Sequence, residues 1–250
     1  MTNLGQFEGP KRRAPRSPLA TKWRRFRKNV FVSLAIDLLV IVGTALVLSL
    51  LIKTFLIRSF FIPSGSMLET LQIDDRIIVN ELVPDIVPLN RGDIVVFKDP
   101  GGWLGLAPEI QLDPLSAAGE WLLSAFGIAA PDSSQHLVKR VIGLPGDHVV
   151  CCDVDGKLTI NGQPITEPYL APGAKPSEVE FDVVVPEGSF WVMGDNRPNS
   201  EDSRFHDDLP SKGFVGAEFV VGRAFVISWP FSNFTWLDNY PDVFKDVPKP

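Results

Sequence analysis

A stretch of 23 residues, 30–52, constrains this 250-residue chain more than any other feature, because its only charged side chain is Asp37. A helix of that length, at about 1.5 Å per residue, exceeds the roughly 30 Å hydrocarbon core of a bilayer. The stretch is also longer than the apolar core of a cleaved secretory signal, which is about 7–15 residues. The alternative, a long buried core helix, usually has a polar face. We therefore predict a transmembrane helix over residues 29–53, in which Asp37 is either tolerated in its protonated form or paired inside the membrane.

Charge is distributed unevenly on the two sides of this span. Residues 1–28 hold nine of the 24 Lys and Arg residues but one of the 30 acidic residues, so the remainder has a net charge of −14. Clustered basic residues before a span keep the N-terminus in the cytoplasm. We predict a basic cytoplasmic tail over residues 1–28 and an extracytoplasmic domain over residues 54–250. The acidic domain argues against a nucleic-acid-binding surface.

Short runs rich in β-branched and aromatic residues follow the span and predict β-strands. The turn pairs Asp155-Gly156 and Asn161-Gly162 flank one of these runs, which is typical of consecutive hairpins. We predict a mostly β fold, an antiparallel and barrel-like domain. The expected strands are residues 77–79, 93–97, 138–142, 148–150, 157–160, 179–185, 190–193 and 219–229.

One segment of this domain, residues 101–135, is apolar, poor in charge and lacks the β pattern. We predict that it is a partly helical insert, with a helix that Asp113 caps and Pro114 begins. Trp103 and Trp121 lie in the same segment. Two interpretations stay open for it, a packed lobe and a contact with the membrane surface.

The two cysteines, Cys151 and Cys152, are adjacent in the chain. Disulfides form readily outside the membrane, but neighbouring cysteines close only a strained ring. We expect two free thiols rather than a structural disulfide, with a strained pair as the minor alternative. Neither these cysteines nor the histidines have the spacing of a metal site, so we expect no metal and no cofactor.

Ser66 lies about a dozen residues beyond the span, and a lysine, Lys139, lies in the β-like run of residues 137–143. A serine hydroxyl becomes a good nucleophile when a base takes its proton. The usual base is a histidine, and the chain has His136, His148 and His206. A lysine serves only when burial lowers its pKa from ~10.4 towards neutrality, and a drop of about three units costs roughly 4 kcal/mol. Taken singly, Ser66 is typical of a turn and Lys139 of a solvent-facing strand position.

Four segments in order carry much more information than either residue alone. They are residues 63–67 (PSGSM), 91–97 (RGDIVVF), 139–147 (KRVIGLPGD) and 194–204 (GDNRPNSEDSR). The series resembles the conserved boxes of bacterial type I signal peptidases, which use a Ser-Lys dyad. The resemblance implies a membrane-anchored serine endopeptidase that removes signal peptides from exported preproteins at the outer face of the membrane, without a cofactor. It also implies substrates with small residues, typically alanine, at the first and third positions before the cut.

The same resemblance implies roles for individual residues. Ser66 matches the nucleophile and Lys139 the general base. The hydroxyl of Ser64 and the backbone N–H of Ser66 match the oxyanion hole. Ser200 matches the serine that hydrogen-bonds and orients the lysine.

Two further residues of the last box match a pair that holds this loop in place, Asp202 and Arg204. We assign residues 195–197, in the same box, to turn and loop structure. The chain departs from the family pattern at Glu69, where a proline is common, in the longer segment 205–212, in the insert, and in having one predicted span where many relatives have two.

Two other classes of protein remain as alternatives. One is an anchored β-domain that binds a partner without catalysis, in which Ser66 and Lys139 are incidental. The other is a self-cleaving switch that uses the same Ser-Lys chemistry. Such switches have a DNA-binding domain, and the 28-residue basic tail is too short for one. The expected partners are exported preproteins and the lipid bilayer.

Overall fold

The computed structural model describes residues 30–105 and 135–250. The basic tail and the helix expected after Pro114 lie outside these residues, as does Trp121. The chain divides into two compact units, residues 1–50 and residues 51–250. Each unit is described by itself below.

The first element is a 26-residue helix, α2 (Val30–Phe55). Its segment Phe31–Leu50 has a mean hydropathy of 2.5, and none of it is buried inside the protein. The helix is therefore long and apolar enough to cross a membrane, by length and composition. Its described bounds agree with the expected span to within two residues.

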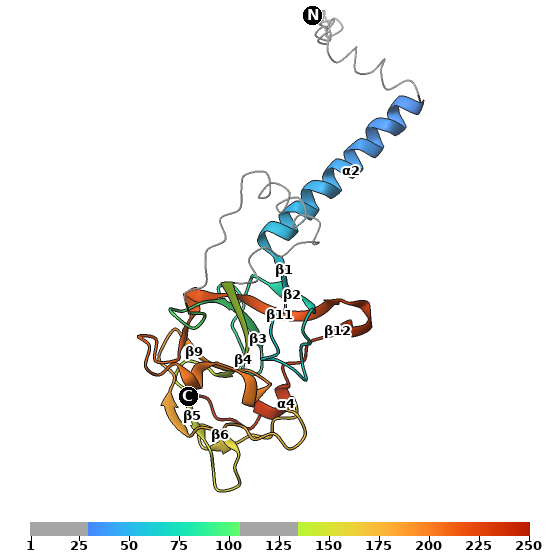
Figure 1. The fold of residues 1–250 in the computed structure, drawn as a ribbon. Helices are drawn as coiled ribbons and strands as arrows, with labels where there is room; N and C mark the ends of the chain where they lie inside the picture. Colours follow the sequence, from blue (N-terminus) through green and yellow to red (C-terminus); the bar gives the residue numbers. More distant parts are fainter. Residues whose placement is uncertain (1–29, 106–134) are drawn as a thin grey trace, which may run out of the picture. The chain divides into compact units, whose positions relative to one another are not determined.

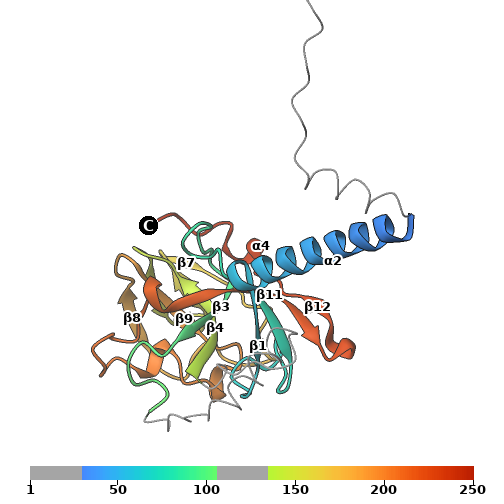
Figure 2. The same ribbon diagram turned by 90° about the horizontal axis from the view of Figure 1, so that it is seen from above.

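The large sheet of the second unit has eight strands in the order β1-β2-β11-β3-β4-β9-β10, with β12 paired to β11. All of its pairings are antiparallel. Figures 1 and 2 both show the β11–β12 hairpin projecting from this sheet. The strands are β1 (Ile57–Phe61), β2 (Arg76–Asn80), β3 (Ile94–Lys98), β4 (His136–Gly143), β9 (Ser189–Met193), β10 (Val215–Gly216), β11 (Val220–Trp229) and β12 (Thr235–Trp236).

A second, four-stranded sheet has the order β7-β6-β5-β8 and is also antiparallel. In Figure 1, β5 and β6 lie at the opposite end of the body from β1 and β2. Asn161 and Gly162 have φ of 51° and 78°, as a tight hairpin turn needs, and they join β6 to β7. The strands are β5 (His148–Cys151), β6 (Leu158–Ile160), β7 (Gln163–Pro164) and β8 (Phe181–Val184).

Short helical turns and one short helix complete the described elements: η2 (Arg197–Asn199), η3 (Ser203–Phe205), η4 (Ala217–Phe219), η5 (Phe231–Asn233) and α4 (Pro241–Phe244). The prediction of a mostly β, antiparallel domain is confirmed. Each expected run coincides with a strand, and no end of a strand differs from the expected end by more than two residues. The short strands β1, β7, β10 and β12 were not predicted.

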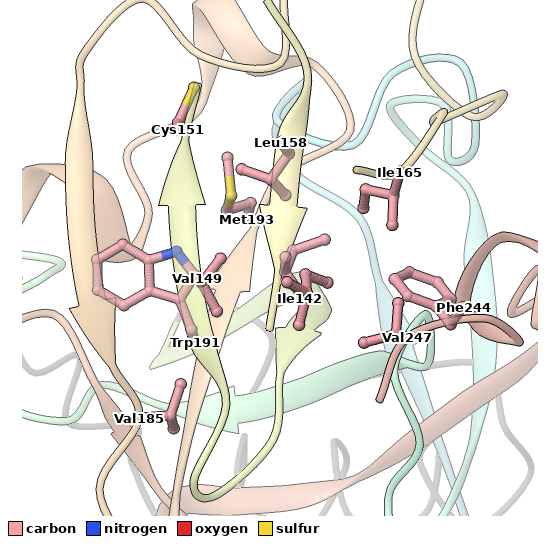
Figure 3. Close-up of a cluster of buried hydrophobic side chains, with 11 residues drawn as sticks. Ile142, Val149, Cys151, Leu158, Ile165, Val185, Trp191, Met193, Phe244 and Val247 are labelled. Carbon is pink, nitrogen blue, oxygen red and sulfur yellow. The ribbon is translucent and has the colours of Figure 1, made fainter. Parts of the chain in front are cut away.

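Three clusters of buried apolar side chains support the two sheets. The cluster in Figure 3 joins the small sheet to β4, β9 and the C-terminal segment, and includes Ile142, Val149, Trp191, Met193 and Phe244. In β4, Val141 packs in a different cluster from Ile142. Side chains on both faces of this strand are therefore buried, and so a charged residue on β4 is desolvated.

The expectation for the cysteines is wrong. Cys151 and Cys152 form a disulfide in the structure. A cis peptide joins them, which places the two side chains on the same side of the chain, where the sulfurs meet. Cys151 is buried at the end of β5 in the cluster of Figure 3.

Candidate active site

Ser66 is fixed by the packing of the turn that carries it. The turn follows β1 and is anchored by Met67 and Leu71, which are 1% and 0% exposed. The backbone N–H of Leu71 donates to the carbonyl of Met67 at 2.8 Å, so the turn closes on its own buried side chains. These two buried side chains, which follow Ser66 in the chain, thus hold the turn and the Ser66 hydroxyl in place.

Lys139 approaches Ser66 from the middle of the large sheet. It lies on β4 opposite Val95 of β3, and its Nζ is 2.8 Å from Ser66 Oγ. The lysine is 4% exposed. Burial lowers the pKa of Lys139 to about 8, although the negative charge of Asp202 opposes this shift. At pH 7 about a tenth of this amine is therefore unprotonated and able to accept a proton, far more than for an ordinary lysine.

The three histidines are placed differently from Lys139. His136 lies at the start of β4, with its ring centroid 5.0 Å from that of Phe60. His206 lines the cavity that contains Ser66 and Lys139, but its Nδ1 lies 2.8 Å from the backbone carbonyl of Asp202. His148 pairs with Asp182, an exposed residue of β8. In the described part of the chain, the side chain that is hydrogen-bonded to Ser66 Oγ is that of Lys139. The geometry favours lysine over histidine as the base.

Ser64 and Ser200 line the same cavity as the Ser66–Lys139 pair. The hydrogen bond that we expected from Ser200 to the lysine is absent, since Ser200 Oγ is buried without a hydrogen-bond partner among the described residues. Ser200 and the carbonyl of Ser66 both approach residue 194 closely, and this requires a glycine. A Cβ at Gly194 would collide with Ser200 Oγ and with the carbonyl oxygen of Ser66. The oxyanion role of Ser64 and the orienting role of Ser200 stay predictions.

Asp202 and Arg204 form a buried ion pair within the loop that ends at η3. Arg204 Nε donates to Asp202 Oδ1 at 2.7 Å and Nη2 donates to Oδ2 at 2.8 Å. Asp202 Oδ2 also accepts the backbone N–H of Gly194 at 2.9 Å. The carboxylate therefore ties both ends of the 194–204 loop together, and its charge acts on Lys139.

Residues 195–197, which we had assigned to turn structure alone, make the contacts that hold the nucleophile turn. Asn196 donates its backbone N–H to the carbonyl of Ser66 at 3.1 Å and its side-chain Nδ2 to the carbonyl of Gly65 at 2.8 Å. Asp195 accepts two hydrogen bonds from Arg140, the neighbour of Lys139 in β4. Asp195 and Asn196 belong to the fourth sequence segment, residues 194–204, which pointed to a functional loop. Their partners, however, lie more than 50 residues away in the sequence, so the contacts themselves were not predicted.

Arg197 of the same loop is also buried and charged. Its Nη2 pairs with Glu167 Oε1 at 2.5 Å, and the two side chains are 1% and 2% exposed. Its Nε donates to the carbonyl of Gly194 at 3.0 Å. The loop that faces Ser66 is thus fixed at both Asp195 and Arg197, which limits its movement relative to the nucleophile.

The cavity around the Ser66–Lys139 pair has a volume of about 660 Å³, within the range of ordinary binding pockets. One wall comes from the start of the insert. Trp103 stacks flat on His206, with ring centroids 4.2 Å apart and planes at 3°, and is 5% exposed. The backbone N–H groups of Gly101 and Trp103 each donate to Asp99 Oδ1 at 2.9 Å. Trp103 is therefore packed, as the first of our two interpretations of the insert has it, while most of that segment lies outside the described residues.

Within residues 30–105 and 135–250, no three His, Cys, Asp or Glu side chains are grouped so that they could hold a metal ion. Neither cysteine lines the cavity of Ser66.

The fold and site define an antiparallel β protein with a buried lysine against a serine in a surface cavity, the arrangement of a serine hydrolase. The family model described as signal peptidase, peptidase S26, matches residues 35–229. The chain belongs to this family of serine peptidases.

Similar proteins include signal peptidase I of Mycobacterium tuberculosis, 40% identical over 76% of this chain and 70% of the relative. Signal peptidase I of Leptolyngbya laminosa is 36% identical over 77% of this chain and 78% of the relative. Signal peptidase I T of Bacillus subtilis is 34% identical over 76% and 82%. Together with the apolar helix α2, the family indicates a membrane-anchored peptidase.

Proposed function

We propose that this protein cleaves N-terminal signal peptides from exported preproteins, with Ser66 as the nucleophile and Lys139 as the general base. The observation that carries the proposal is the 2.8 Å approach of Lys139 Nζ to Ser66 Oγ inside the cavity. The lowered pKa of this lysine, about 8 because of burial, supports its role as a base. Family membership supports the substrate class.

In the first step, unprotonated Lys139 accepts the proton of Ser66 Oγ as the oxygen attacks the carbonyl carbon of the scissile peptide bond. The tetrahedral intermediate carries an oxyanion. The backbone N–H of Ser66 and the hydroxyl of Ser64 are placed in the nucleophile turn to donate to it, and losing one such donor typically costs about 10²–10³ in rate.

In the second step, the protonated lysine gives its proton to the departing amine, the N-terminus of the mature protein. An ester between Ser66 and the signal peptide remains. Lys139 then accepts a proton from the water molecule that attacks the ester. It returns this proton to Ser66 Oγ as the C–O bond breaks, which releases the signal peptide with a free C-terminal carboxyl group and restores Ser66. Water is the sole co-reactant.

The proposed membrane orientation follows from the distribution of basic residues around α2. The basic residues that precede α2 place the N-terminus in the cytoplasm, so that the catalytic domain, residues 54–250, is extracytoplasmic. A signal peptide that spans the same bilayer then presents its cleavage site on the side where Ser66 lies. Protease added outside spheroplasts is expected to digest the catalytic unit and leave the tail intact. Protection of the catalytic unit would contradict the orientation.

Preprotein cleavage in trans tests the reaction. The full chain in detergent, mixed with a labelled preprotein, is expected to release one fragment cut after a small residue. Ser66→Ala is expected to abolish the cut, whereas Ser232→Ala, an exposed serine outside the cavity, is a matched control. An active Ser66→Ala variant would favour the non-catalytic β-domain, and cleavage of the protein's own chain alone would favour the self-cleaving switch.

A further inference from the structure

One side of the cavity around Ser66 has no part in the proposed reaction. Three apolar side chains line it there, Leu104, Leu137 and Phe205, and we call them the apolar wall. Leu104 is 38% exposed and Phe205 is 45% exposed, so both leave apolar surface open to solvent. Covering such surface with another apolar group is favourable, because it removes that surface from water. The apolar wall therefore favours an apolar group as its ligand.

The apolar wall is held in place by the residues behind it. The carboxylate of Asp99 accepts the backbone N–H groups of Trp103 at 2.9 Å and of Leu104 at 3.1 Å, which closes the turn after β3. Trp103 stacks flat on His206, the residue after Phe205. This stacked pair ties together the two segments that supply Leu104 and Phe205. A preformed site of this kind loses little conformational entropy when it binds a ligand.

The position of Lys139 indicates which part of a substrate faces the apolar wall. In the proposed reaction this lysine gives its proton to the departing amine, so the amine lies beside Nζ. Leu137 is two residues before Lys139 in β4, and alternate residues of a strand point to the same face. Glu201 and Arg204, in the loop that leads to Phe205, are near enough for their charges to act on Lys139. The apolar wall thus adjoins the lysine, and it faces the residues that follow the cut.

A negative charge beside the apolar wall adds a second preference. Glu201 lines the same cavity and is exposed. Among the described residues that line the cavity, it is the one carboxylate. A carboxylate on the substrate would be repelled by it. The site therefore disfavours an acidic side chain just after the cut.

We propose that the apolar wall is a subsite for the mature part of the substrate, which takes an apolar side chain at one of the first two residues after the cut. An extended chain advances about 3.3–3.6 Å per residue, so the first residues beyond the cut are those within reach of a wall beside Lys139. The inference rests on the proposed function, since it describes a part of the preprotein. Leu104 and Phe205 belong to the insert and to the segment 205–212, where the chain departs from the family pattern. We therefore expect the preference to differ between this chain and its relatives.

Cleavage of matched preproteins tests the subsite. The substrates share one signal peptide and carry Leu, Ala, Asn or Asp at the first or the second residue after the cut, and the full chain is assayed in detergent. We expect kcat/KM to be about tenfold higher for Leu than for Ala at one of these positions, because the larger side chain buries more apolar surface. At that position Asp should be cleaved about tenfold less efficiently than Asn, which has a similar shape but no charge.

Ratios of kcat/KM for two substrates separate the subsite from a general loss of activity, because a change in the base affects both substrates. Leu104→Ala and Phe205→Ala should each lower the Leu-to-Ala ratio to about threefold or less, whereas Phe205→Leu should retain more of it. Glu201→Gln should remove most of the discrimination against Asp. Phe231→Ala is the matched control, because Phe231 is 77% exposed and lies outside the cavity, and it should keep both wild-type ratios.

Binding to the inactive Ser66→Ala variant distinguishes a failure of this inference from a failure of the proposed function. Fluorescence anisotropy of labelled peptides that span the cut gives Kd without cleavage, and the Leu peptide should bind several-fold more tightly than the Ala peptide. Cleavage with equal kcat/KM for Leu and Ala at both positions would overturn the subsite and leave the proposed function intact. Absence of cleavage by the wild type, together with a Leu preference in binding that Phe205→Ala removes, would overturn the proposed function and support the subsite. A changed preference in Phe205→Ala for residues before the cut would overturn the subsite, because the apolar wall would then face the signal peptide.

Discussion

Arg140 donates two charge-assisted hydrogen bonds to Asp195, from Nε to Oδ1 at 2.8 Å and from Nη2 to Oδ2 at 2.7 Å. Both side chains are fully buried. Each is the neighbour of a functional position, because Arg140 follows Lys139 in β4 and Asp195 precedes Asn196, which holds the carbonyl of Ser66. The pair therefore sets the relative position of the strand that carries the base and the loop that supports the nucleophile.

Breaking this pair should be costly. Asp195→Ala leaves an uncompensated buried guanidinium, and such a change typically costs about 3–5 kcal/mol of unfolding free energy. Urea denaturation measures the loss. Asp242→Ala is the control, since its pair with Lys245 is exposed and 4.0 Å long, and the expected change is below about 1 kcal/mol. An apolar double variant, Arg140→Met with Asp195→Leu, should recover part of the loss, and an equal loss in Asp242→Ala would contradict the account.

Asn196→Ala should affect turnover more than stability. The change removes the 2.8 Å hydrogen bond from Nδ2 to the carbonyl of Gly65, so the nucleophile turn is less well positioned. We expect kcat to fall roughly tenfold, equivalent to about 1.4 kcal/mol, with a small change in KM. Steady-state kinetics on a preprotein substrate give both constants. An unchanged kcat with a raised KM would mean that Asn196 contacts substrate and does not position Ser66.

Burial of Lys139 should make the folded protein less stable than an apolar variant at neutral pH. Its folded pKa, about 8, is below the ordinary 10.5, so the unfolded state binds more protons between these values and stability rises with pH across that window. Below pH 8 the full penalty applies, about 3 kcal/mol at 1.36 kcal/mol per pKa unit. Lys139→Met should therefore unfold at higher urea than the wild type at pH 7, although it is inactive, and the difference should shrink by pH 10.5. A difference that is the same at both pH values would rule out the desolvated amine as its cause.

The disulfide between Cys151 and Cys152 should be dispensable for catalysis. It lies at the end of β5, and neither residue lines the cavity of Ser66. The double variant Cys151→Ser/Cys152→Ser should keep most of the wild-type kcat/KM, as should the wild type after treatment with a reductant. A loss comparable to that of Ser66→Ala would point to a thiol nucleophile.

Local sequence signals were sufficient for eight of the twelve described strands and for the dyad candidates. Runs of β-branched and aromatic residues and turn pairs such as Asn161-Gly162 are local signals, and β6 forms between the turns that predicted it. Ser66 and Lys139 were singled out by residue type and by the order of motifs, and the structure places them 2.8 Å apart. The short strand β10 was missed because its two residues pair with β9 through a register that no local pattern encodes.

The contacts that sequence analysis did not predict are between residues that are distant along the chain. From the sequence, Asp195 is typical of a turn. In the structure it accepts a hydrogen bond from Arg140, which is 55 residues earlier in the chain. Ser200 was expected to bond the lysine, yet its Oγ has no partner in the described part of the chain. Cys151 and Cys152, which we expected as free thiols, form a disulfide in the structure.

The pH dependence of cleavage decides which residue is the base. If unprotonated Lys139 accepts the serine proton, kcat/KM should rise with pH through an apparent pKa near 8 and reach a plateau above it. Lys139→Arg should be inactive at every pH, because a guanidinium stays protonated. His206→Gln is the sharpest comparison, since His206 lines the same cavity, and it should keep the profile and most of the rate. An inactive His206→Gln beside an active Lys139→Ala would assign the base to histidine instead, and the 2.8 Å contact between Lys139 and Ser66 would then be structural.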